Sequence, residues 1–139
     1  GLMEEVRLAG FTFCDPTDTN ALEATSTAEC TVAEAFGAGS GGEPTGARPF
    51  DNVNDYADAA GTAKAAFDIG GVLSDAHGNP FGVDGYSALV TIRPAVLNGI
   101  GATAATADTD VLRITIDVSY GDDKLSLDGY RTRYAPNSP

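Results

Sequence analysis

The stretch that decides the fold is DVLRITIDVSY at residues 110–120, followed by the turn GDD at 121–123 and by KLSLDGYRTRY at 124–134. Apolar and polar residues alternate through the first stretch, and this period of two is typical of an antiparallel strand with one buried and one solvated face. A tight turn and a return strand are predicted to follow. The expected buried face consists of Leu112, Ile114, Ile116, Val118 and Tyr120, and then of Leu125 and Leu127.

A further strand is predicted over residues 86–96, before a long surface connection rich in Ala, Gly and Thr at 98–109. Pro94 cannot donate to a strand ladder, so this strand is expected at an edge of the sheet. Gly129 interrupts the last strand and indicates a β-bulge. The buried residues expected from the first strand are Tyr86, Ala88, Val90 and Ile92.

Residues 2–11 have helical spacing, with Leu2, Val6 and Ala9 on one side, and Pro16 forbids a continuation. Isolated helices shorter than about 12–15 residues are marginal in water. We therefore expect the end of a longer helix, packed on the sheet. A short independent capping helix is the alternative.

The middle of the chain is predicted to be irregular. Residues 30–35 favour one helical turn, and the Gly-rich run at 37–42 favours a flexible loop. Phe50, Val53 and Tyr56 recur every three residues, which predicts a helical or 3₁₀ turn that holds the core. The chain is thus expected to be one α+β domain over 1–139: helix end at 1–13, disulfide loop and irregular middle at 14–85, and antiparallel sheet at 86–136.

Composition excludes several classes of partner. The 139 residues carry 42% hydrophobic residues, which is typical of a globular domain, and a net charge of −12. So acidic a chain is not expected to bind nucleic acid, which requires Lys and Arg against phosphates. An anionic membrane surface is excluded by the same argument.

Cys14 and Cys30 flank a loop-like segment and are predicted to form a disulfide, hence an oxidising compartment. Closing a loop of about 15 residues stabilises a protein by about 3 kcal/mol. Two unrelated buried thiols are the alternative. A zinc site is disfavoured because zinc ligands cluster, and His77 is the single histidine.

The sequence does not favour an enzyme. His77 lies in a turn-rich segment without a recognisable nucleophile motif, and a surface-loop histidine is the simpler interpretation. The Gly-rich run at 37–42 is not followed by Lys and Ser or Thr, so it is not a phosphate-binding P-loop. We therefore expect no catalytic residues and no cofactor.

Calcium is the one ligand that the residues suggest. Asp75, Asn79 and Asp84 bracket a turn-rich loop, and Asp51, Asn52 and Asp55 form a second oxygen-rich group. Hard cations prefer such oxygen sets. Asp and Asn also serve turns without any ion, and this is the simpler alternative.

The end of the chain carries candidate interface residues: Tyr130, Arg131, Arg133 and Tyr134. Tyr and Arg are enriched at protein interfaces. The two arginines alternate with the tyrosines, so they should project from the opposite side of the last strand and could anchor a neighbour's carboxylates. Local pairing with acids such as Asp117 is the alternative.

A helix end, a loop-rich middle, an antiparallel sheet and a cysteine pair together resemble a type IV pilin-like subunit. The stretches FDNVNDY at 50–56 and LDGYRTRYAP at 127–136 resemble minor pilins of the mannose-sensitive haemagglutinin (MSHA) pilus, the MshD-like group, and FCDP at 13–16 and GY at 85–86 fit the same pattern.

The resemblance implies a structural, non-catalytic role in filament assembly, priming or capping, with other pilin subunits as partners. It implies a prepilin held in the inner membrane of a Gram-negative bacterium by an apolar helix that is missing here, with a periplasmic head that later joins an extracellular pilus. The isolated head is expected to be monomeric. The alternatives are an adhesin-like surface binding module and a pseudopilin of a type II secretion system.

Overall fold

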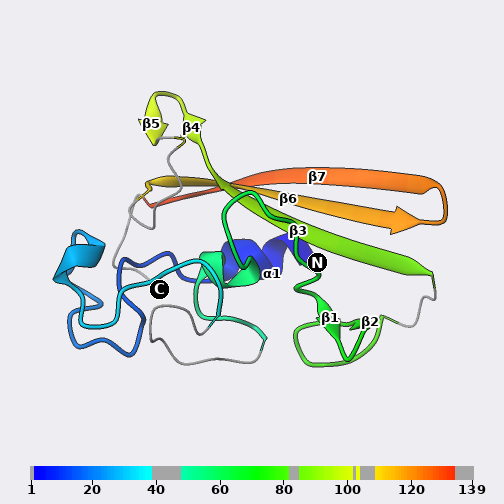
Figure 1. The fold of residues 1–139 in the computed structure, drawn as a ribbon, viewed down its shortest axis with the longest axis horizontal. Helices are drawn as coiled ribbons and strands as arrows, with labels where there is room; N and C mark the ends of the chain where they lie inside the picture. The colour runs from blue at the N-terminus through cyan, green and yellow to red at the C-terminus, as the bar shows by residue number, and fades with distance from the viewer. Residues whose placement is uncertain (1, 39–47, 82–84, 102, 104–108, 134–139) are drawn as a thin grey trace.

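The computed structural model describes residues 2–38, 48–81, 85–101, 103 and 109–133, and these form a mixed α+β structure (Figure 1). One short α-helix lies beside antiparallel sheets. The elements are α1 (Leu2–Leu8), η1 (Thr27–Glu29), η3 (Val53–Tyr56), β1 (Asp68–Ile69), β2 (Val72–Leu73), β3 (Tyr86–Pro94), β4 (Val96–Leu97), β5 (Ile100–Gly101), β6 (Val111–Tyr120) and β7 (Asp123–Thr132).

The main sheet has the strand order β3-β6-β7 with antiparallel pairing throughout, so the predicted three-strand meander is confirmed. β3 is an edge strand and Pro94 is its last residue, as expected. Two further pairs, β1–β2 and β4–β5, form small hairpins outside the main sheet. The β4–β5 hairpin falls at the start of the segment that was expected to be a plain surface connection.

The predicted bulge at Gly129 is wrong. The β6–β7 register runs one residue against one through this position, with Ile114 opposite Gly129 and Arg113 opposite Tyr130. A Cβ atom on Gly129 would lie 2.9 Å from Met3 Sδ and 3.4 Å from Arg7 Cδ. The glycine therefore provides room for α1 to cross β7, and the strand itself stays regular.

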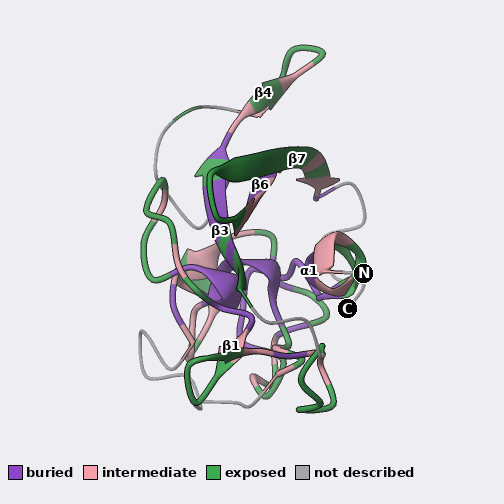
Figure 2. Cartoon of the chain, turned by 90° about the vertical axis from the view of Figure 1, so that its right-hand side faces the viewer, coloured by how far each residue is buried: buried purple, intermediate pink, exposed green. Residues whose placement is uncertain are grey.

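The core lies between the inner face of the main sheet and the segments that cover it (Figure 2). Val90, Ile92, Ile114 and Ile116 are fully or almost fully buried, as the alternation predicts. α1 contributes Val6, and Ala9 follows directly after the helix, which ends at Leu8, earlier than expected. The middle segments contribute Val53, Tyr56 and Phe67, so the predicted 3₁₀ turn that holds the core is confirmed.

The predicted disulfide between Cys14 and Cys30 is present, and it shapes the segment that follows. The predicted helical turn at 30–35 is wrong: Cys14 forms an antiparallel bridge with Ala33, and Glu34 N donates to Phe13 O. Extended pairing with residues 13–15 holds this segment, and the nearby 3₁₀ turn is η1, just before Cys30.

Part of the expected buried face is exposed instead. Leu125 is 59% and Leu127 46% exposed, while Tyr120 is 49% and Tyr86 42% exposed. The pairing places all four on the inner face, since Val118 is opposite Leu125, Ile116 opposite Leu127, and Tyr86 opposite Tyr120. The β6–β7 hairpin extends past the N-terminal end of α1 (Figure 1), so the helix covers only the Gly129 end of β7.

Candidate functional site

A groove of about 690 Å³ lies between α1, residues 49–51 and residues 75–81. We call it the acidic groove because Glu4, Glu5, Asp51 and Asp75 are among its lining residues, and no Lys or Arg is among the described ones. Its apolar surface comes from Leu2, Leu8, Ala9, Pro49, Phe50, Ala76 and Phe81, and His77 also lines it. The groove thus combines apolar surface with carboxylates.

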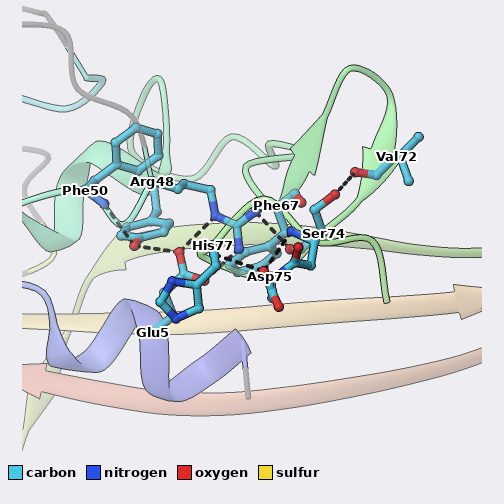
Figure 3. A network of polar contacts seen from close by, with 10 residues as sticks. Glu5, Arg48, Phe50, Phe67, Val72, Ser74, Asp75 and His77 are labelled. Atoms are coloured by element: carbon cyan, nitrogen blue, oxygen red, sulfur yellow. Dashed lines mark hydrogen bonds and ion pairs between the residues drawn. The ribbon is translucent and has the colours of Figure 1, made fainter. Parts of the chain in front are cut away.

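A buried ion pair joins α1 to the irregular middle at the wall of this groove. Arg48 binds the Glu5 carboxylate in a bidentate manner, with Nε–Oε2 2.9 Å and Nη2–Oε1 2.6 Å. The same guanidinium donates through Nη1 to the carbonyl oxygens of Phe67 and Ser74, at 2.8 and 2.9 Å (Figure 3). The two side chains are only 4% and 10% exposed, so the pair is almost fully removed from water.

Tyr56 completes this network. Its hydroxyl donates to Glu5 Oε2 at 2.8 Å and accepts from Phe50 N at 3.2 Å. Burial would raise the pKa of the Glu5 carboxyl, but hydrogen bonds from Arg48 and Tyr56 outweigh it and leave that pKa below its usual value. Burial and the bond to Glu5 together raise the pKa of the Tyr56 hydroxyl.

This lowered pKa predicts an acid-dependent loss of stability. A carboxyl whose pKa is lower in the folded state stabilises the fold above its unfolded pKa, about 4.3, and loses that contribution as the pH falls through the folded pKa. Urea unfolding at pH 6 and pH 3 should therefore show a larger loss for the wild type than for Glu5→Gln. The exposed Glu23→Gln serves as the control and should behave as the wild type. Equal losses in all three would contradict the role of Glu5.

A second groove, of about 490 Å³, lies on the other side of α1. We call it the basic groove because Arg7 and Arg131 line it. Its remaining lining is formed by Glu4, Leu8, Tyr130 and Thr132. Ion pairs within the described part of the chain join Arg48 to Glu5, Lys64 to Asp58 and Arg113 to Asp128, and none of them involves Arg7 or Arg131.

Arg131 is the most unusual charge of the basic groove. Its Nη1 donates to Thr132 O at 3.1 Å, whereas its buried Nε has no acceptor among the described residues. Burial, and then the nearby positive charge of Arg7, lower the pKa of the Arg131 guanidinium. A carboxylate bound in the basic groove would stabilise the charged form of Arg131 against both its burial and its repulsion by Arg7.

The remaining residues of the predicted interface are not all in this groove. Tyr130 is 38% exposed at its rim. Arg133 is buried between the rings of Phe11 and Phe13, 3.8 and 4.0 Å from their centroids, and donates to Phe11 O and Thr109 O. Tyr134 lies outside the described residues. Asp117 faces the opposite side of the sheet from Arg131, where Ser126 donates to it.

The residues predicted for calcium are divided. Asp75 Oδ1 accepts hydrogen bonds from His77 N and Asn79 N, both at 2.9 Å, so its carboxylate closes a turn. These backbone donors lower the pKa of the Asp75 carboxyl. Asp84 lies outside the described residues. The structure therefore describes two of the three predicted calcium ligands, Asp75 and Asn79.

The structure brings together a carboxylate group that the sequence did not predict. One oxygen each of Asp15, Glu34 and Asp51 lies within 4.8 Å of the other two. Asp15 and Glu34 are buried, but Asp15 Oδ2 already accepts from Thr17 N. Only Asp51 carried a signal in the sequence, as part of an oxygen-rich run.

Comparisons with protein-family models, with curated proteins and with solved structures find no match for this chain. Among the helices of the described residues, none has the length and apolar character to cross a membrane.

Proposed function

We propose that this chain is the globular head of a structural minor subunit of a type IV pilus of the MSHA type. In this role it acts through subunit–subunit contacts in filament assembly, priming or capping. The observation that supports the proposal most directly is an uncovered apolar strip on the inner face of the main sheet. The strip consists of Leu125, Leu127, Tyr86 and Tyr120, which are between 42% and 59% exposed.

The strip continues the buried face of the main sheet, and this position suits it to packing against a protein partner. Its residues share a face with the core residues Ile114 and Ile116, so it is a continuation of the core surface without a cover. Tyr86 and Tyr120 stack with ring centroids 4.6 Å apart at its far end. Contiguous exposed apolar surface on a soluble domain is typical of an interaction site.

The position of α1 supports a helix as the covering element. α1 already crosses this face at Gly129, and the β6–β7 hairpin continues beyond the N-terminal end of the helix (Figure 1). In the proposed pilus subunit, an apolar helix anchors the head in the inner membrane before the head enters the extracellular filament. Such a helix, or that of a neighbouring subunit, would cover Leu125 and Leu127.

An adhesin-like binding module is the second candidate, and the acidic groove favours it. Phe81 is 45% exposed, and Phe50 lines the same groove together with four carboxylates. Exposed aromatic rings and hydrogen-bonding oxygens are what a saccharide site requires.

The test replaces the apolar strip and leaves the opposite face intact. Leu125→Asp/Leu127→Asp should reduce incorporation of the tagged protein into sheared surface filaments of its source bacterium by at least about tenfold, since a buried carboxylate without a partner costs several kcal/mol. The melting temperature of the head should change little because both leucines are exposed. Quantitative immunoblots of the filament fraction measure incorporation.

The matched control is Lys124→Asp, which makes the same change of net charge as the two leucine substitutions but on the outer face of the same strand. It should enter filaments as the wild type does. Wild-type protein that is absent from filaments would overturn the proposal. A gene deletion that blocks protein secretion and leaves filaments intact would instead identify a pseudopilin.

A further inference from the structure

The acidic and basic grooves flank one exposed ridge of α1. The ridge consists of Glu4 and Leu8, which are one helical turn apart and line both grooves. Leu8 is 82% exposed, more than any other large apolar side chain among the described residues. A large apolar side chain between two grooves of opposite charge is a self-complementary arrangement.

The charges on the two sides of the ridge are complementary. On one side, Asp51 is an exposed residue of the acidic groove, and its carboxylate lies within 4.8 Å of those of Asp15 and Glu34. On the other side, Arg131 and Arg7 repel one another, and Arg131 Nε is buried without an acceptor among the described residues. An Arg131–Asp51 contact between two molecules would give the buried Nε of Arg131 an acceptor and would place an opposite charge beside each group.

We infer that this ridge is a weak, two-fold symmetric contact between two copies of the chain, in which Arg131 of each copy binds Asp51 of the other. Both grooves include Glu4 and Leu8 in their linings, so they adjoin the same exposed ridge. Rotation of a second copy by a half turn about an axis near Leu8 places each basic groove against the partner's acidic groove. This is an isologous contact, which closes as a dimer.

A head-to-tail contact fits the arrangement less well. A head-to-tail contact uses two complementary surfaces on different sides of the molecule. The acidic and basic grooves instead lie beside the same ridge. The net charge of −12 opposes any association of two copies, and the ridge is small, so the dimer is weak. The inferred dimer differs from the monomer expected from the sequence. It uses only surfaces of this chain and does not rest on the pilus proposal.

A charge exchange tests the contact. Sedimentation equilibrium of the wild type at low salt, up to about 1 mM protein, should show a monomer–dimer equilibrium in the weak range of small interfaces. Arg131→Glu alone and Asp51→Lys alone should each weaken it by at least about tenfold, because each homodimer then holds two like-charge contacts. An equimolar mixture of the two variants should restore association, since both contacts of the mixed dimer pair opposite charges.

Two matched controls separate the contact from net charge. Lys124→Glu and Asp122→Lys change the net charge by the same amounts at exposed positions away from the ridge, and neither should abolish the dimer in the way that its counterpart does. If Arg131→Glu fails to fold, as judged by its melting curve, Arg7→Glu takes its place as a single variant and should weaken the dimer, because Arg7 is exposed in the same groove.

The symmetry has a test of its own. Leu8→Cys should form a disulfide-linked dimer on mild oxidation, because a two-fold axis near Leu8 brings the two new thiols together. A monomeric wild type at about 1 mM, a mixture that does not associate, or a Leu8→Cys variant that stays uncross-linked while the wild type dimerises would each overturn the inference.

Discussion

Arg48→Leu is expected to lower the free energy of unfolding by about 3–5 kcal/mol, the usual cost of removing one partner from a buried ion pair. The Glu5 carboxylate would remain only 10% exposed without its guanidinium. The carbonyl oxygens of Phe67 and Ser74 would also lose the donors from Nη1. Because small domains are stable by only about 5–15 kcal/mol, such a loss should be evident in urea unfolding at neutral pH.

The chain offers a matched control for this prediction. Arg113 and Asp128 also form an ion pair, at 2.7 Å, but their side chains are 46% and 43% exposed. Arg113→Leu should therefore cost only about 0–1 kcal/mol, the range for exposed pairs. Glu5→Leu/Arg48→Leu should recover part of the stability lost in Arg48→Leu, because no charge is then left buried. Equal effects of Arg48→Leu and Arg113→Leu would show that burial does not decide the strength of the pair.

Loss of the Cys14–Cys30 disulfide is expected to cost about 3 kcal/mol, because it closes a loop with a sequence separation of 16. The bridge also belongs to a small apolar cluster of its own, with Phe13, Ala21 and Ala24, apart from the main core. This cluster is too small to replace a covalent link. Most of the loss should therefore appear as loosening of the segment between the two cysteines.

Urea unfolding with and without a reductant measures the effect, and Cys14→Ala/Cys30→Ala provides the permanent equivalent. Amide hydrogen exchange should accelerate most within residues 14–34, where Asp15 N–Val32 O and Glu34 N–Phe13 O bonds close the loop. The fully buried β6 residues Ile114 and Ile116 should change only with global stability. A reduced protein with unchanged stability and unchanged exchange would contradict this role of the disulfide.

The sheet could be predicted from the sequence because its signal is local. Alternation from Leu112 to Ile116 sets the face of β6, and Gly121 and Asp122 supply the turn before β7. Pro94 marks an edge strand by its chemistry alone. The pairing of Cys14 with Cys30 could also be predicted, because the chain has only these two cysteines.

The candidate sites could not be predicted, because they depend on segments that are distant in sequence. Glu5 and Arg48 are 43 residues apart, and no local pattern links them. Arg131 was a candidate from its residue type, but its place beside Arg7 depends on how α1 crosses β7. Gly129 illustrates the limit: a glycine within a strand suggests a bulge locally, whereas here it accommodates a helix.

The sequence by itself therefore determined the three strands of the main sheet, the turn between β6 and β7, the edge position of β3 and the disulfide, since residue type and spacing act over a few neighbours. Only the tertiary structure decided which parts of a predicted face are covered. Leu125 and Leu127 have the same alternation as Ile114 and Ile116, yet they are exposed, because burial requires a second element and α1 covers only the Gly129 end of β7. Likewise, only packing placed acidic and basic grooves on either side of one ridge.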